Sequence, residues 1–156
     1  MSPQYWAGFF DGEGNIDLRF RETHGGKYKR FELRLAIAQV YSPVLELMQS
    51  EYGGSIWCGK SGVSRLVIAS NEARRFLEEI QPFCIVKKDE LQIALDFFNV
   101  VDNTPAHHRP GQRFFNRTPV EVQEKKIVLF HAMRDARIAK GLKSKAREGV
   151  RLPYAA

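Results

Sequence analysis

Two stretches near the N-terminus, residues 15–21 and about 27–39, alternate between apolar and polar residues with period two. This alternation predicts strands that bury one face and leave the other in water. A turn at His24-Gly25-Gly26 separates them and indicates an antiparallel hairpin whose polar side is rich in arginine. The predicted buried side consists of Ile16, Leu18, Phe20, Phe31, Leu33, Leu35 and Ile37.

Helical spacing and punctuation by Pro and Gly predict the remaining elements. We expect a helix before residue 14, a helix from Ser42-Pro43 with Ser42 as its cap, two short strands at 55–59 and 63–69, and helices at 71–81, 88–101 and 119–140. The order is that of a single α+β domain over residues 1–156, with helices on one face of a four-stranded antiparallel sheet. Its parts are a core at 1–100, a loop at 101–118, a C-terminal helix at 119–140 and a basic tail at 141–156.

The net charge of +6 is unevenly distributed along the chain. Residues 19–34 carry +4 and residues 134–151 carry +5, so the rest of the chain sums to −3. Concentrated basicity is typical of a surface that binds a polyanion. The sequence has neither a run of apolar residues long enough to span a membrane nor a signal peptide, so we expect an intracellular protein without a membrane or small-molecule partner. Cys58 and Cys84 are expected to be buried free thiols.

The segment Tyr5–Gly14 reads as an apolar helix that runs into two acids set between glycines. Asp11 and Glu13 then lie at a helix C-terminus, where unpaired carbonyl groups already concentrate negative charge. Carboxylates beside such carbonyl oxygens suit a hard divalent cation. An ordinary acidic turn after a buried helix is an equally good interpretation of these residues alone. Helical spacing also places four residues on one face, where small side chains allow a second backbone to approach closely: Ala7, Gly8, Asp11 and Gly12.

The order of an apolar body, small residues, acid-Gly-acid-Gly and then a strand resembles the motif of the LAGLIDADG homing endonucleases. The resemblance implies the αββαββα fold with a saddle-like sheet, and packing of this helix against its twin across a two-fold axis. It also implies that Glu13, with the carbonyl of Gly12, binds a catalytic Mg²⁺, for which Mn²⁺ or Ca²⁺ can substitute in binding. Because the chain contains one copy of the motif, the resemblance implies a homodimer with an interface at Ala7, Gly8, Asp11 and Gly12.

Two further residues match polar positions of the same family. Gln39 ends the second strand in phase with the apolar Ile37, and the resemblance places it near the nucleophilic water; a strand that simply ends there is the simpler interpretation. The segment Gln81–Lys87 resembles one that ends in an active-site lysine, which favours Lys87 over its neighbour Lys88. A lysine near a scissile phosphate can neutralise developing negative charge. The histidines are interpreted as structural or solvated.

A DNA-binding sheet requires base contacts on its polar face and phosphate contacts at its margins. Arginine matches the major-groove edge of guanine, and an acid can accept a hydrogen bond from cytosine. The predicted base contacts are Asn15, Asp17, Arg19, Arg21, Arg30, Glu32 and Arg34, with Trp57 and Arg65 as weaker candidates. The predicted phosphate contacts are Lys27, Lys29, Lys140, Lys143 and Lys145.

The function that these residues predict is site-specific, metal-dependent hydrolysis of double-stranded DNA at a long pseudo-palindromic site. Two alternatives remain open from the sequence. One is a protein on the same scaffold that binds nucleic acid without cutting it, such as an intron splicing cofactor or a regulator. The other is an unrelated α+β domain that binds RNA, for which aromatic residues should be exposed on the sheet.

Overall fold

Helices alternate with pairs of strands in the order that the sequence predicts. The structure, a computed structural model, describes residues 1–23, 28–59, 61–103 and 119–141. Its elements are α1 (Pro3–Glu13), β1 (Gly14–Thr23), β2 (Tyr28–Gln39), α2 (Pro43–Tyr52), β3 (Ser55–Cys58), β4 (Ser64–Ala69), α3 (Ser70–Ile80), the 3₁₀ turn η1 (Gln81–Phe83), α4 (Lys88–Asp102) and α5 (Val120–Ala139). The predicted loop at 101–118 and tail at 141–156 lie almost wholly outside the described residues.

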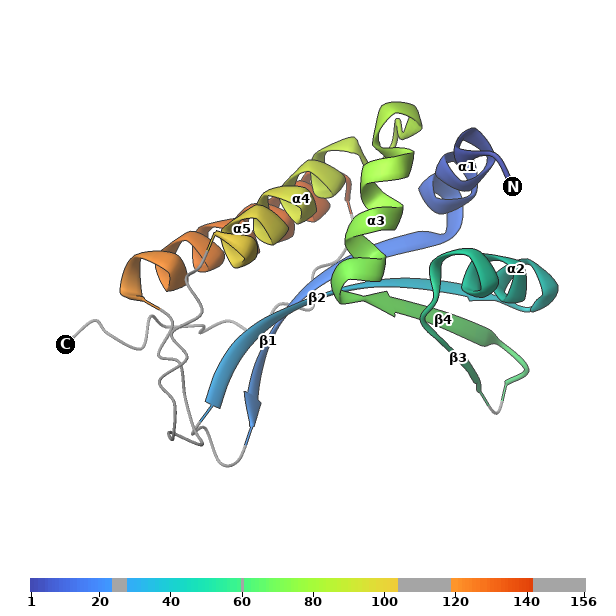
Figure 1. The fold of residues 1–156 in the computed structure, drawn as a ribbon, viewed down its shortest axis with the longest axis horizontal. Coiled ribbons are helices and arrows are strands. Elements are labelled where there is room, and N and C mark those ends of the chain that lie inside the picture. Colours follow the sequence, from blue (N-terminus) through green and yellow to red (C-terminus); the bar gives the residue numbers. More distant parts are fainter. Residues whose placement is uncertain (24–27, 60, 104–118, 142–156) are drawn as a thin grey trace.

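The four strands form one antiparallel sheet in the order β1-β2-β4-β3, so β1 and β3 are its edges. The predicted hairpin is confirmed, with Gly14 opposite Ile37 at one end and Thr23 opposite Tyr28 at the other. Figure 1 shows the sheet as an arch, with α1, α3, α4 and α5 on its outer side and the inner side uncovered by described helices. No helix in the described ranges is long and apolar enough to cross a membrane.

The core lies between the sheet and the helices. Alternate residues of the strands point into it, and Leu35, Ile37 and Leu66 are completely buried. From α1, Trp6 and Phe10 enter the same core, where the Phe10 ring meets Phe76 of α3 edge-on at 5.2 Å. Because alternate residues of each strand are buried on one side of the sheet, the residues between them lie on the opposite side, which the described helices do not cover.

Two local predictions need correction. Ser42 precedes α2, but its hydroxyl donates to the Glu46 carboxylate (3.0 Å) and does not cap the backbone, because Ser42 already has helical dihedral angles. Cys84 is a buried free thiol as expected, whereas Cys58 is exposed because it ends the edge strand β3. The prediction that Pro82 stops the preceding helix is confirmed: α3 ends at Ile80, and Pro82 lies within η1.

We predict that Gly14→Ala destabilises the protein by about 1–3 kcal/mol, because the new methyl group overpacks the core. A Cβ at Gly14 would lie 2.2 Å from the ring of Phe10, which is itself fully buried. Urea denaturation under dilute conditions measures the change. The control is Gly8→Ala on the exposed side of α1, where no atom from beyond the neighbouring backbone of the helix lies within 4 Å of the added carbon. Equal losses for both substitutions would contradict this account.

Candidate active site and nucleic-acid interface

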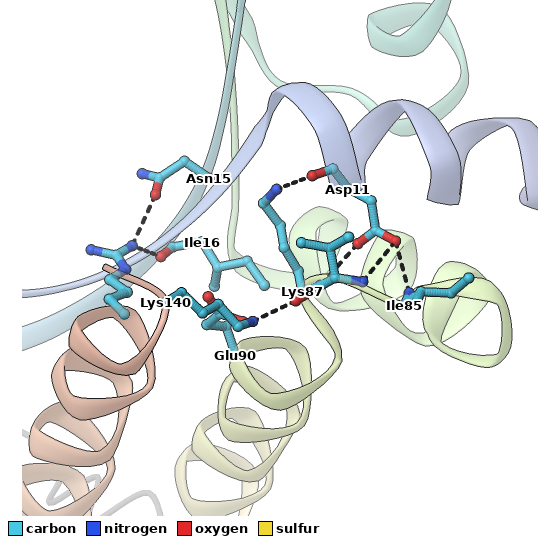
Figure 2. A network of polar contacts seen from close by, with 9 residues as sticks. Asp11, Asn15, Ile16, Ile85, Lys87, Glu90 and Lys140 are labelled. Atoms are coloured by element: carbon cyan, nitrogen blue, oxygen red, sulfur yellow. Dashed lines mark hydrogen bonds and ion pairs between the residues drawn. The ribbon is translucent and has the colours of Figure 1, made fainter. Parts of the chain in front are cut away.

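The carboxylate of Asp11 binds the backbone of the segment that leads into α4. Its Oδ2 accepts hydrogen bonds from the amides of Ile85 (2.7 Å) and Val86 (3.1 Å), and its Oδ1 accepts one from the amide of Lys87 (3.0 Å). Figure 2 shows Asp11 at the end of α1 with Ile85 and Lys87 facing it. Asp11 therefore fastens the last turn of α1 to a segment more than seventy residues away.

This arrangement changes the acidity of three neighbouring groups. Burial alone would raise the pKa of Asp11, but the three amide hydrogen bonds and the Lys87 ammonium outweigh burial and lower that pKa. Burial, together with the Asp11 charge, raises the pKa of the Cys84 thiol to about 12. Burial lowers the pKa of Lys87, although Asp11 and Glu90 oppose that effect. Cys84 is accordingly an inert thiol, while Asp11 is held as a carboxylate.

Glu13 and Gly12 are both exposed at the last turn of α1. A helix C-terminus offers carbonyl oxygens without intrahelical partners, so these residues supply the hard oxygen donors that Mg²⁺ prefers. No three His, Cys, Asp or Glu side chains cluster around a common point within the described ranges. One protomer thus offers donors of the type that magnesium prefers, with Glu13 as the exposed carboxylate at this helix end.

Lys87 and Gln39 both lie beside this helix end. The Lys87 ammonium donates to the backbone carbonyl of Asp11, whereas Lys88 is exposed on the first turn of α4. Gln39 is opposite Ser64 in the sheet, two positions beyond Ile37, which faces Gly14 at the start of β1. The structure therefore brings two predicted catalytic positions, Gln39 and Lys87, to the junction of α1 and β1 that carries Glu13.

The strand registers place all nine predicted base contacts on the same, uncovered face of the sheet. Asp17 is opposite Arg34, Arg19 is opposite Glu32, and Trp57 is opposite Arg65. Antiparallel partners point to the same side, so the pairings define one continuous surface. We call this surface the open face, and its predicted members are Asn15, Asp17, Arg19, Arg21, Arg30, Glu32, Arg34, Trp57 and Arg65.

Charged side chains of the open face are paired with one another. The Arg21 Nε lies 3.0 Å and the Arg34 Nε 3.7 Å from the same Glu32 oxygen, and Arg19 pairs with Asp17. The contacts to Glu32 are ion pairs without hydrogen-bond geometry, and the buried Nε and Nη2 of Arg34 find no hydrogen-bond acceptor in the described part of the chain. Trp57, which a strand position would usually bury, is 67% exposed here.

The C-terminal helix contributes two residues whose roles the sequence did not reveal. Arg137 hydrogen-bonds to Asn15 (3.0 Å) and to the carbonyl of Ile16 at the edge of β1. Lys140, predicted to contact phosphate, instead donates to the Val86 carbonyl and to the buried carboxylate of Glu90. Figure 2 shows Lys140 beside Glu90. A buried carboxylate requires a cationic partner, so this lysine is engaged within the protein.

The remaining predicted sites divide between exposed, buried and undescribed positions. Gly8 and Gly12 are exposed, and a methyl group at either position would meet no atom within 4 Å from beyond the neighbouring backbone of the helix. Ala7 is fully buried, so it faces the core of its own chain and not a second subunit. The side chains of Lys27, Lys29, Lys143 and Lys145 lie outside what the structure describes.

No protein-family model matches this sequence, and no curated protein matches it. Solved structures do match its fold. They include the archaeal intron-encoded homing endonuclease I-Vdi141I complexed with DNA, with a TM-score of 0.68 and 19% identity over 92% of this chain and 85% of that one. The homing endonuclease I-CvuI, in complex with a DNA target in the presence of Mg, has a TM-score of 0.63 and 16% identity over 91% of this chain and 96% of its own.

A further match is the LAGLIDADG homing endonuclease I-GzeII in complex with its DNA target. It has a TM-score of 0.68 and 14% identity, and the match covers 99% of this chain but 55% of I-GzeII. The chain therefore has the LAGLIDADG homing endonuclease fold, which confirms the resemblance first drawn from Tyr5–Gly14.

We predict that Asp11→Asn lowers the stability at pH 7 by about 2 kcal/mol, because three hydrogen bonds lose their charged acceptor. The folded pKa of Asp11 lies below its ordinary value of 3.8. The stabilisation by the carboxylate is therefore complete above that value and is lost as the pH falls through the lower, folded pKa. The gap between the two proteins should close in strong acid.

Denaturant unfolding at pH 7, 4 and 2.5 tests this expectation. The control is Asp135→Asn on α5, whose side chain is 68% exposed and should change stability by less than about 0.5 kcal/mol. A deficit of Asp11→Asn that stays constant across these pH values would contradict the account.

Proposed function

We propose that the protein is a site-specific, metal-dependent endonuclease of double-stranded DNA that works as a homodimer. The observation that carries the proposal is the open face: all nine predicted base contacts share it. It begins at Asn15, two residues after Glu13, so the surface that would read DNA adjoins the carboxylate that would hold metal. The DNA complexes of I-Vdi141I, I-CvuI and I-GzeII support the same assignment by fold.

The dimensions of the strands suit a duplex. At about 3.3 Å per residue, β1 and β2 would each extend roughly 30–40 Å, close to the 34 Å of one duplex turn. The described helices cover the outer side of the arched sheet (Figure 1), and because the apolar strand residues are buried beneath them, the arginines lie on the other, uncovered side. Arg19 and Arg21 have exposed guanidinium groups on that side, and their N–H donors match guanine or phosphate oxygens.

The homodimer follows from what a single chain lacks. One protomer brings one exposed carboxylate, Glu13, to the end of α1, and the exposed Gly8 and Gly12 leave room for a second helix. I-GzeII is nearly twice as long as the part that this chain matches. Two copies of this chain, related by a two-fold axis along α1, would place two Glu13 side chains at one seam and read a pseudo-palindromic site.

The residues at this seam have separable roles in phosphodiester hydrolysis. Glu13 and the Gly12 carbonyl would bind Mg²⁺, which supplies charge neutralisation at the phosphate and a lowered pKa of water. Lys87, half-buried beside α1, would neutralise negative charge on the phosphate, and Gln39 would orient the attacking water. Asp11 would act indirectly, because its hydrogen bonds fix the backbone of Lys87.

Two alternatives are separated by experiment. Lys87 and Asp11 make contacts that a protein without cleavage activity could keep for stability alone, which is the observation in favour of a pure DNA-binding function. The exposed Trp57 is the feature that an RNA-binding sheet would share. It is the only aromatic residue among the open-face side chains that the structure describes, whereas such sheets stack several bases.

We predict that Glu13→Gln reduces cleavage at least about 100-fold and leaves site-specific binding intact, because it removes a metal ligand while preserving shape. Duplex libraries incubated with Mg²⁺ report cleavage, and the same libraries with Ca²⁺ report binding. The control is Glu124→Gln on the exposed surface of α5.

Each outcome of that comparison has a separate meaning. Specific binding without cuts by the parent protein would favour the DNA-binding alternative. Cleavage by Glu13→Gln equal to that of the parent would exclude Glu13 as the metal ligand. Preference for single-stranded RNA over every duplex would favour the RNA-binding alternative.

We predict that Gly8→Leu weakens dimerisation at least about tenfold, equivalent to about 1.4 kcal/mol, because the side chain separates the two helices. The protomer itself should tolerate leucine, since the space above Gly8 is open. Analytical ultracentrifugation measures the dissociation constant, and Ser50→Leu on the exposed surface of α2 is the control. An unchanged dissociation constant would place the interface elsewhere.

A further inference from the structure

The edge strand β1 is fastened from outside the sheet by one arginine of α5. Because β1 pairs only with β2, the carbonyl groups on its outer edge have no partner within the sheet. The Arg137 guanidinium donates to one of them, the carbonyl of Ile16. Figure 2 shows Asn15 and Ile16 beside the end of α5. The contact joins residues 121 positions apart in the chain.

The same guanidinium reaches two side chains of the open face. Its Nη2 donates to Oδ1 of Asn15 at 3.0 Å, and its Nη1 lies 3.9 Å from the carboxylate of Asp17. Asp17 also pairs with Arg19, and its side chain is 15% exposed. Arg137 therefore contacts the two predicted base contacts that lie nearest to Glu13.

The helix that carries Arg137 is held on both sides of it. Met133, one turn earlier, is 2% exposed in the core, and Lys140, three residues later, is bound to Glu90 and to the Val86 carbonyl. Residues three and four apart lie on the same side of a helix. The planar guanidinium is thus presented from a fixed backbone and is not a mobile surface side chain.

This contact determines how Asn15 presents its amide. An asparagine side chain has an acceptor oxygen and a donor nitrogen, and either can face outward. Because Oδ1 faces Arg137, the amide NH₂ group of Asn15 is turned away from α5 and toward the open face. A fixed NH₂ donor matches the acceptors of guanine, adenine or thymine in the major groove and clashes with the amino group of cytosine.

We infer that Arg137 is a positioning residue that sets base discrimination by Asn15 and Asp17 without itself reading a base. The inference rests on the proposed function, because it requires that the open face bind duplex DNA. It makes the C-terminal helix part of the specificity of the sheet, although α5 lies outside the strands that carry the contacts.

The test is a binding selection with Ca²⁺ on a library of duplexes of about 24 base pairs, the length of roughly two duplex turns. The variants are Arg137→Gln, Arg137→Lys and the matched control Arg134→Gln, which removes the same charge one turn earlier, where Arg134 pairs with Asp135. Asn15→Ala and the double variant with Arg137→Gln complete a double-mutant cycle. Thermal unfolding of each variant is recorded alongside.

We expect Arg137→Gln to lose about tenfold discrimination against cytosine at one symmetric pair of positions, while the other positions keep their preferences. Arg137→Lys should restore part of the discrimination against cytosine. In the Asn15→Ala background, Arg137→Gln should cause no further loss of discrimination at this pair of positions. Arg134→Gln should weaken binding to all duplexes alike and leave the preferences unchanged.

Three results would overturn the inference. They are unchanged discrimination in Arg137→Gln, a uniform loss of affinity matching that of Arg134→Gln, and a lower melting temperature with the preferences of the parent preserved. If the parent protein itself prefers no duplex, the proposed function fails and the inference fails with it, a result that is distinct from the other three.

Discussion

The rest of the site depends on one interaction, in which the Asp11 carboxylate accepts hydrogen bonds from three backbone amides. It couples the end of α1 to the start of α4 and thereby fixes Lys87, whose ammonium returns to the Asp11 carbonyl. An acid at a helix C-terminus is unfavourable by itself, since it meets the negative end of the helix dipole. Here the amides offset that repulsion, as the lowered pKa of Asp11 indicates. The first acid of the motif is thus structural, which leaves the second, exposed Glu13 available for a ligand.

The fold could be predicted from the sequence wherever a local pattern matches the global arrangement. The period-two alternation of β1 and β2 gives the hairpin, its buried face and its arginine-rich face, because the side chains of a strand alternate strictly. Small residues in Tyr5–Gly14 likewise predict a helix with an open side, and Gly8 and Gly12 do lie there. Ala7 shows the limit of that argument, because its spacing predicts the same side of the helix as Gly8 and Gly12, whereas in the structure it is buried in the core.

The rest of the site could not be predicted because it consists of contacts between distant segments. Nothing near Arg137 or Lys140 in the sequence indicates that one reaches Asn15 and the other Glu90, since both belong to a basic stretch that looks solvated. The one available signal was their separation of three residues, which places both on one side of α5. The sequence around Glu90 contains no signal of its burial, because acids in the first turn of a helix are common and usually exposed. The predicted phosphate contact of Lys140 therefore disagrees with the structure, in which its ammonium binds the Val86 carbonyl and the Glu90 carboxylate.

The surface proposed to bind DNA contains acids as well as arginines, and the pairing of charges on the open face accounts for them in a way that net charge does not. Asp17 and Glu32 lie among the arginines and pair with them. The guanidinium groups of Arg19 and Arg21 are exposed, and pairs of exposed charges contribute about 0–1 kcal/mol, so these two arginines could exchange their partners for guanine or phosphate at little cost. The acids also repel a phosphate backbone that approaches without the matching bases. Under the proposed function, they would weaken sequence-independent binding more than specific binding, which is the balance that a protein reading one site among many requires.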